Sequence, residues 1–218
     1  MYLARSCQFF QRCAGQLPLR DDNIPLANMK VLLFLVAASA VVYGQAPQPC
    51  IAPKLWEARM SRIDPSKRFF ERARVSYDAI NQRMRIIEEV NIKEQRDFFD
   101  VLYLHNVGKE YRFNMKTKEC AVKELTDAFR PFEVPDNATS FGESYIGTGA
   151  FPGDGVLITL WGGEGKEGRY MAAFTNNGCV PVEDGFCSER IGCVHTSFYD
   201  VVAGVSDPNV FIPPKECE

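Results

Sequence analysis

Two histidines and eight cysteines are among the most reactive side chains in this 218-residue sequence. His195 lies in the alternating stretch 193–197, and His105 follows the apolar stretch 98–104. Both positions are typical of histidines in strands. A hydrolase would need one of them within hydrogen-bond reach of a serine and a carboxylate. The chain also lacks a GxSxG elbow, an HExxH pair and a phosphate-cradling glycine loop. We therefore predict that it is not an enzyme.

Acidic residues in the second half of the chain offer the hard oxygen ligands that calcium prefers. Their spacing does not follow an EF-hand loop, so the sequence makes calcium a candidate cofactor but leaves its ligands unknown. The acidic positions considered are Asp136, Glu143, Asp154, Glu164, Glu167, Glu183 and Asp184.

The chemistry open to the cysteines depends on an apolar segment near the start of the chain. Lys30 is followed by about a dozen apolar residues and then by the small residue Gly44, an arrangement typical of a signal peptide. The run is short for a bilayer-spanning helix of about 20 residues. We predict a signal peptide over residues 29–44, cleaved after Gly44, and a mature domain over residues 45–218. Residues 1–28 are then an upstream extension outside the fold; the alternative is a signal anchor with a short cytosolic tail.

Six cysteines remain in the mature domain, and an even number in an exported chain predicts three disulfides. They are Cys50, Cys120, Cys179, Cys187, Cys193 and Cys217. Fifteen pairings are open on sequence alone, although the short interval from Cys187 to Cys193 favours a local bridge across a hairpin. A zinc site is the competing interpretation. The chain has only two histidines and no paired CxxC spacing, so disulfides are favoured.

The charge of the mature domain argues against a nucleic-acid partner. Four of the 25 Lys and Arg residues and two of the 28 Asp and Glu residues precede residue 45, which leaves 21 against 26 and a net charge near −5. Basic residues gather early in the domain, either as solvated strand faces or as a contact for anionic lipid headgroups or sialylated glycans. These residues are Arg59, Arg62, Lys67, Arg68, Arg72, Arg74, Arg83 and Arg85.

The stretch Asn137-Ala138-Thr139 is the only Asn-x-Ser/Thr sequon in the sequence, and it follows Pro135 in a polar segment. In an exported protein this motif predicts a glycan on Asn137.

The elements that position these residues are strands, because the dominant hydrophobic period is two. Apolar and polar residues alternate around Trp56, Tyr77 and Phe113. The stretches 98–104 and 156–161 are apolar on both faces, which indicates central strands covered on both sides. Turn residues separate about ten or eleven such runs, so we predict one all-β domain, an antiparallel sandwich or curled barrel.

Two further expectations concern the segments between and within the strands. Residues 125–129 are compatible with one short helical turn before Pro131. The chain is also rich in aromatic residues, with 16 Phe, 8 Tyr and 2 Trp. These rings can fill a solid core or line a concave apolar cavity, and period-two patterning alone cannot distinguish the two arrangements.

The two ends of the domain carry a family resemblance. It opens on Cys50-Ile51-Ala52-Pro53-Lys54-Leu55-Trp56-Glu57 and closes on Asp207-Pro208-Asn209-Val210-Phe211-Ile212-Pro213-Pro214-Lys215-Glu216-Cys217. Between them lie Ser76-Tyr77-Asp78, Asn81-Gln82-Arg83, Glu119-Cys120, the sequon and Gly178-Cys179-Val180-Pro181-Val182. In this order and spacing the motifs resemble the ependymin-related family over residues 50–217.

The resemblance implies a secreted or lysosomal glycoprotein. Its fold would be two antiparallel sheets curled into a half-open barrel or sandwich around an apolar pocket, similar to bacterial lipoprotein carriers. It further implies homodimerisation, association with calcium and a role in cell–matrix adhesion. Carried over by position, Cys50 would pair with Cys179 and Cys120 with Cys217. Cys187 and Cys193 depart from the family pattern and add a local bridge.

The resemblance also favours an open pocket over a filled core. The residues predicted to line it are Trp56, Phe99, Val101, Tyr103, Phe113, Ile158, Leu160, Phe174 and Phe198. A one-residue slip in register would exchange the two faces of a strand. The first functional hypothesis is a secreted, non-catalytic binder of a fatty acid, phospholipid or glycolipid. The alternative is a calcium-associated matrix or adhesion protein that acts through its surface and its glycan.

Overall fold

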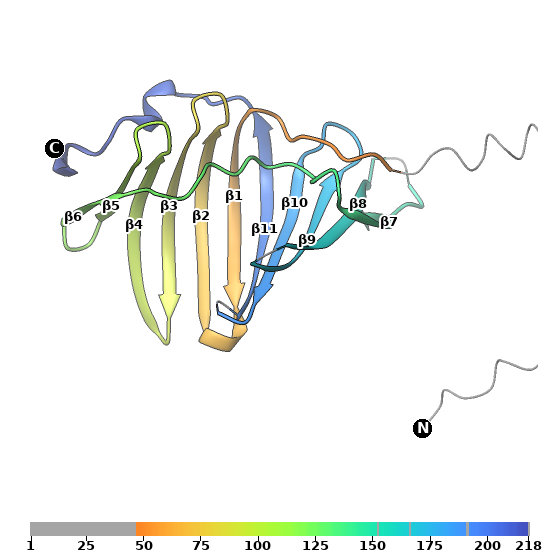
Figure 1. Cartoon of the computed structure of the whole chain (residues 1–218), viewed down its shortest axis with the longest axis horizontal. Helices are drawn as coiled ribbons and strands as arrows, with labels where there is room; N and C mark the ends of the chain where they lie inside the picture. The colour runs from red at the N-terminus through yellow and green to blue at the C-terminus, as the bar shows by residue number, and fades with distance from the viewer. Residues whose placement is uncertain (1–46, 152, 166, 191, 218) are drawn as a thin grey trace, which may run out of the picture. The chain divides into compact units, whose positions relative to one another are not determined.

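A computed structural model of the chain describes residues 47–151, 153–165, 167–190 and 192–217 (Figure 1). The predicted upstream extension (1–28) and signal peptide (29–44) lie outside the described residues.

The alternating stretches form eleven strands, as the period-two pattern predicts. Their bounds are β1 Leu55–Asp64, β2 Phe69–Asp78, β3 Arg83–Ile92, β4 Gln95–Leu104, β5 Lys109–Asn114, β6 Cys120–Glu124, β7 Thr139–Gly147, β8 Gly155–Gly165, β9 Gly168–Thr175, β10 Pro181–Ser188 and β11 Gly192–Ala203. Three short 3-10 helices accompany them: η1 Pro65–Lys67, η2 Pro208–Phe211 and η3 Lys215–Cys217. The all-β prediction is confirmed.

All eleven strands belong to one antiparallel sheet in the order β6-β5-β4-β3-β2-β1-β11-β10-β9-β8-β7. Two meanders, β1–β6 and β7–β11, meet where β1 pairs with β11. Because β1 also pairs with β2 along its whole length, the hydrogen-bonded ladder has no break there. The sheet is therefore continuous where two sheets were expected, and it is not closed into a barrel, because β6 and β7 lie at opposite edges.

A single connection, residues 125–138, runs from one edge of the sheet to the other (Figure 1). We call it the strap. A flat sheet of eleven strands at about 4.8 Å spacing would be about 48 Å wide, and fourteen residues reach at most about 50 Å when fully extended. The strap must therefore be nearly straight or the sheet must curl beneath it. The helical turn expected at residues 125–129 is wrong for this reason: the segment contains no helix, since a helix would shorten its reach.

The strap defines the inner face of the sheet. Phe132 of the strap packs edge-on against Trp56 of β1 and Tyr77 of β2, with ring centroids 5.1 Å apart in both pairs, and against Phe198 of β11 at 5.6 Å. The backbone N–H of Phe132 donates to the Tyr77 hydroxyl at 3.2 Å. Trp56 is fully buried at the centre of this aromatic cluster, which also contains Val75.

The C-terminal segment lies against the outer face, the side opposite the strap. The Arg85 guanidinium of β3 donates to the carbonyl of Val210 at 2.6 Å, and Arg83 stacks over the Phe211 ring at 4.2 Å. On β4, Val101 of the inner face and Leu102 of the outer face are both fully buried. This confirms the prediction that the stretch 98–104 is covered on both sides.

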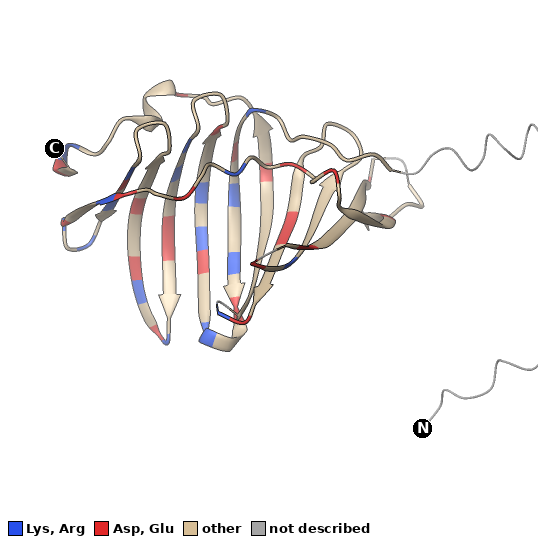
Figure 2. Ribbon diagram, in the orientation of Figure 1, with Lys and Arg blue, Asp and Glu red and all other residues tan. Residues whose placement is uncertain are grey.

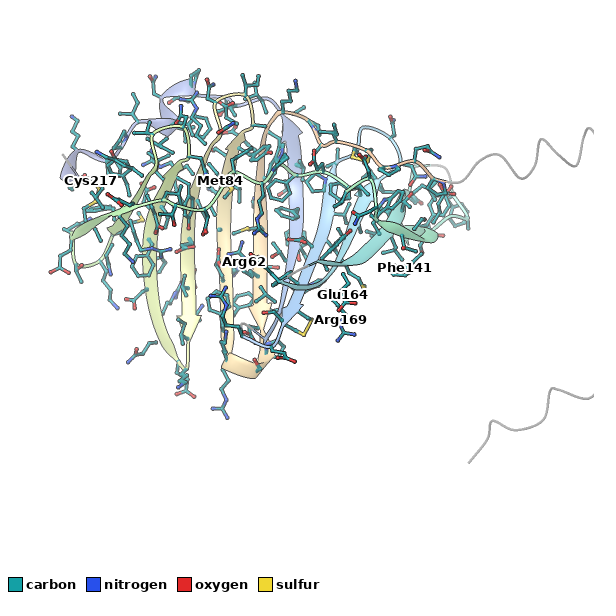
Figure 3. The ribbon with its side chains drawn as sticks, in the orientation of Figure 1. Arg62, Met84, Phe141, Glu164, Arg169 and Cys217 are labelled. Atoms are coloured by element: carbon teal, nitrogen blue, oxygen red, sulfur yellow. A yellow bond between two sulfur atoms is a disulfide. The ribbon has the colours of Figure 1, made fainter. Side chains whose placement is uncertain are left out.

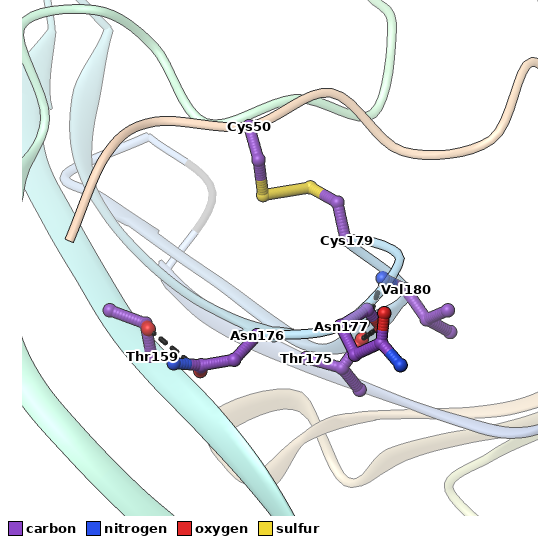
Figure 4. Close-up of a disulfide and its surroundings, with 7 residues drawn as sticks. All are labelled: Cys50, Thr159, Thr175, Asn176, Asn177, Cys179 and Val180. Carbon is purple, nitrogen blue, oxygen red and sulfur yellow. Dashed lines mark hydrogen bonds between the residues drawn. A yellow bond between two sulfur atoms is a disulfide. The ribbon is translucent and has the colours of Figure 1, made fainter.

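Three disulfides are present among the described residues, and they join the pairs that the resemblance and the short interval indicated: Cys50–Cys179, Cys120–Cys217 and Cys187–Cys193. The first ties the segment before β1 to the β9–β10 turn (Figure 4). That turn is ordered by Thr175, whose hydroxyl donates to the Asn177 carbonyl at 2.7 Å and accepts from the Val180 N–H at 2.9 Å.

Charged residues are frequent along the strands of the first meander (Figure 2). Four carboxylates of the described residues are buried, those of Asp64, Glu71, Asp78 and Glu88. Glu71 of β2 is 2% exposed, and its Oε2 accepts from Arg62 at 3.1 Å. No donor among the described residues reaches its Oε1. Burial raises the pKa of Glu71 from 4.5 to about 7; Arg62 opposes this shift and the neighbouring Glu88 carboxylate adds to it.

The strap contact gives a stability prediction. Phe132→Ala should lower the free energy of unfolding by about 3 kcal/mol, because it empties a site lined by three rings. The measurement is guanidinium denaturation with the disulfides intact. Phe151→Ala is the matched control, since that ring is 65% exposed, and its effect should stay within about 0.5 kcal/mol. Equal effects of the two substitutions would contradict the role given to the strap.

Glu71 gives a pH prediction. Its proton is held more tightly in the folded state than in the unfolded state, whose pKa is near 4.5. This contribution to stability is therefore complete below about pH 4.5 and is lost as the pH rises to about 7. Glu71→Gln should remove that loss and raise stability at pH 8 by up to about 3 kcal/mol.

The control is Glu89→Gln on the outer face, whose pKa is lowered by its hydrogen bond with Arg96. Denaturant titrations at several pH values between about 5 and 8 measure both variants. The assignment fails if Glu71→Gln retains the wild-type slope, or if Glu89→Gln flattens it equally.

Candidate functional site

A cavity of about 630 Å³ lies on the inner face, between the strap and the second meander. We call it the inner cavity. Strands β8 to β11 form its floor, and strap residues 130–135 form its roof. The side chains that supply most of its apolar wall are Phe132, Val134, Trp161, Tyr170, Phe174, Phe186 and Phe198.

Strand register brings the floor residues together. Trp161 of β8 is paired with Ala172 of β9, and Ala172 with Asp184 of β10. Tyr170 is paired with Phe186 two positions further along. Because paired residues point to the same face, these side chains share the inner face. A Cβ at Gly163 would lie 2.7 Å from the Tyr170 hydroxyl, so a larger residue there would displace this ring where it crosses β8.

The roof is fixed by backbone contacts with the segment before β1. Ala52 N–H donates to the Phe132 carbonyl at 3.0 Å, and Val134 N–H donates to the Cys50 carbonyl at 2.8 Å. Val134 then packs with Trp161 and with the Cys50–Cys179 disulfide. The disulfide thus joins the roof support to the floor of the cavity.

The polar groups of the inner cavity are mostly acidic. Its described lining includes the carboxylates of Glu133, Glu167 and Asp184 and one cation, Arg130. Glu183 also borders the cavity, but its carboxylate lies on the outer face beside His195. Arg130 is paired with Glu167 at 3.0 Å. Burial raises the pKa of Asp184 above its ordinary value, while the charges of Arg62 and His195 oppose the shift.

Two buried polar atoms on the cavity wall have no hydrogen-bond partner among the described residues. They are the indole Nε1 of Trp161, a residue only 3% exposed, and the hydroxyl of Tyr170. Buried polar groups in folded proteins are almost always satisfied. Atoms left unpaired beside a cavity therefore indicate a site for water or for a polar part of a ligand.

The nine predicted pocket residues are distributed over both faces. Phe174 and Phe198 line the inner cavity. Four others share the inner face but lie in the first meander, where Trp56 and Tyr103 belong to the aromatic cluster around Trp56; the remaining two are Phe99 and Val101. Three lie on the outer face: Phe113, Ile158 and Leu160.

These three outer-face residues were wrongly predicted to line the pocket, because their strands carry apolar side chains on both faces. In β8, Leu160 and Trp161 are adjacent, and the sequence gives no preference for one of them. The structure turns Trp161 inward, whereas Leu160 lines a groove of about 640 Å³ on the outer face. The prediction missed Trp161, Tyr170, Asp184 and Phe186; alternation in β10 places the last two on one face but does not identify which face is covered.

The outer groove is also apolar. Besides Leu160, it is lined by Ile63, Phe141, Met171 and the Cys187–Cys193 disulfide. Phe141 lies at the same end of the sheet as Glu164 and Arg169, which also line the groove (Figure 3).

The histidines do not form a catalytic arrangement with a serine in the described structure. His105 Nδ1 lies 3.0 Å from the Asp127 carbonyl, and His195 Nε2 lies 3.6 Å from a Glu183 carboxylate oxygen. Among the described residues, no group of three or more His, Cys, Asp or Glu side chains could hold a metal ion. The acidic positions considered for calcium are thus not gathered into one metal centre within the described part of the chain.

The basic group early in the domain is largely neutralised by ion pairs. Arg59 pairs with Asp200, Arg62 with Glu71, Lys67 with Asp64, Arg83 with Asp78 and Arg85 with Asp100. Arg62 lies near the middle of the sheet (Figure 3), and its side chain is on the inner face with Glu71.

Within the described residues, no helix is long and apolar enough to cross a membrane.

Comparison with solved structures finds distant similarity. An uncharacterized conserved protein from Thermus thermophilus superposes with a TM-score of 0.47 and 11% identity, over 88% of this chain and 97% of that one. A putative outer membrane lipoprotein-sorting protein domain from Vibrio parahaemolyticus superposes with a TM-score of 0.28 and 9% identity, over 81% and 94%.

Comparison with known sequences gives closer matches. Mammalian ependymin-related protein 1 of Mus musculus is 32% identical over 176 residues, which cover 79% of this chain and 77% of that protein. Ependymin-2 of Carassius auratus is 27% identical over 173 residues, which cover 78% and 80%. The family model described as Ependymin matches residues 93–217, more than half of the chain. These matches agree with the motifs at both ends of the domain, and the chain belongs to the ependymin family.

Proposed function

We propose that this protein is exported and binds a hydrophobic ligand, a fatty acid, phospholipid or glycolipid, without transforming it. The observation that carries the proposal is the inner cavity, whose volume of about 630 Å³ falls within the range of about 300–1,000 Å³ found for small-molecule sites. Aromatic walls with a few polar groups are the lining that such sites use.

Binding energy would come from the apolar chain of the ligand. Burial is worth about 0.8 kcal/mol per methylene, so ten methylenes supply about 8 kcal/mol before the costs of association. A dissociation constant of 1 μM corresponds to about 8.2 kcal/mol. A roof held by backbone hydrogen bonds and a disulfide lowers the cost of ordering the site, since little of it has to become ordered on binding.

Export is supported by the cysteines and the sequon. All six described cysteines are paired, and disulfides form and persist in oxidising compartments. Asn137 is exposed beside β7, where an attached glycan meets solvent.

A plugged cavity tests the proposal. Ala172→Phe places a ring on the cavity floor and should weaken binding of decan-1-ol at least about tenfold, since excluding two methylenes costs about 1.6 kcal/mol. Calorimetric titration of the purified mature protein measures the affinity. Native mass spectrometry of the secreted protein should also show bound lipid in the wild type and less in this variant.

Ala121→Phe is the control, because it adds the same ring at an exposed position on edge strand β6 and should leave binding unchanged. Thermal unfolding checks that both variants are folded. The proposal is wrong if wild-type protein binds no decan-1-ol and carries no lipid, or if folded Ala172→Phe binds as the wild type does.

A further inference from the structure

The position of Asp184 within the inner cavity identifies a second chemical feature of the ligand. Asp184 is paired with Ala172 on one side and with Thr196 on the other. Both partners are small, so no bulky side chain stands directly opposite the carboxylate. The Asp184 side chain is open to the cavity, and no described residue donates a hydrogen bond to it.

Aromatic residues occupy the neighbouring positions on the same face. Phe186 lies two residues along β10, Tyr170 and Phe174 are the diagonal neighbours on β9, and Phe198 is a diagonal neighbour on β11. Diagonal neighbours are about 7–8 Å apart, within reach of aromatic side chains. All four rings line the inner cavity together with Asp184, so an unpaired carboxylate lies among four aromatic side chains.

The cationic side chains in and near the inner cavity already form ion pairs with carboxylates other than Asp184. Arg130, the one cation among its described lining residues, is paired with Glu167 at 3.0 Å. Arg62 is outside the lining; it pairs with Glu71 at 3.1 Å, although its charge also acts on Asp184. A ligand carboxylate would therefore enter a cavity whose walls carry an excess of negative charge.

A positively charged nitrogen fits this environment on two counts. Ammonium and quaternary ammonium groups are attracted to the faces of aromatic rings, and rings arranged around them form their usual binding site in proteins. A carboxylate that accepts from a charged donor forms one of the stronger hydrogen bonds in proteins. Desolvation raises the pKa of Asp184 and the charges of Arg62 and His195 oppose the shift, so a cation placed beside this carboxylate in the cavity would further favour its ionised form.

We propose that the inner cavity selects amphiphiles whose head carries a positively charged ammonium group, with Asp184 as the counter-ion and the surrounding rings as cation–π partners. This inference rests on the proposed function, because the apolar tail of the ligand has to occupy the same cavity. It narrows that function from hydrophobic ligands in general to amine-bearing or choline-bearing lipids, and it disfavours free fatty acids.

Three probes with the same chain length separate the contribution of the head group to affinity from that of the tail. They are decylamine, decan-1-ol and decanoate. Each is titrated calorimetrically at neutral pH, below its micelle concentration. Wild-type protein should bind decylamine at least about tenfold more tightly than decan-1-ol, and decanoate most weakly. Asp184→Asn should remove the advantage of decylamine and change decan-1-ol affinity less than about twofold.

The control is Asp200→Asn, the same change at an exposed carboxylate that pairs with Arg59 at 3.1 Å; all three affinities should match the wild type. Failure of all three probes to bind, in protein that also carries no lipid, would overturn the proposed function and this inference with it. Equal affinities for the three probes would overturn this inference alone. So would tightest binding of decanoate, or an equal loss for all three probes in Asp184→Asn.

Discussion

A connection of fourteen residues that has to cross an eleven-stranded sheet is the constraint on which this molecule depends. The two meanders leave their free strands, β6 and β7, at opposite edges, so the chain can join them only by running across one face. Its reach barely matches the width of a flat sheet. The crossing determines which face is the inner one, and it supplies both the ring that packs against Trp56 and the roof over the cavity.

The strap packs differently against the two halves of the inner face. Where the two meanders meet, Phe132 packs against Trp56, Tyr77 and Phe198, and the space is filled. Further over the second meander, Val134 of the roof contacts Trp161 of the floor, and the inner cavity remains beside this contact. A filled core and an open pocket were alternatives on sequence grounds; the structure contains both, side by side under one connection. Phe198 belongs to each of them.

Local patterning was enough to predict the strands, because alternation is a property of a few neighbouring residues. It also identified β4 and β8 as covered on both sides, which the burial of Val101 with Leu102 bears out for β4. For such strands the sequence could not predict which side chains point to the inner face. Leu160 and Trp161 are both large and apolar, and only the position of the strap decides which one points inward. The strap has no hydrophobic periodicity from which its course could be predicted. For the same reason a helical turn was wrongly expected at its start. Asp184 was considered only as a calcium ligand, since its aromatic surroundings come from three strands.

An open sheet leaves two rows of unpaired backbone groups, and these are sites where another chain could add a strand. Both edges carry features that discourage such growth. Edge strand β6 has only five residues, includes Lys123 and Glu124, and is tethered through Cys120 to Cys217. Edge strand β7 is interrupted by a bulge between Ser140 and Gly142. A sheet this wide can therefore stay open without polymerising into fibrils through its edges.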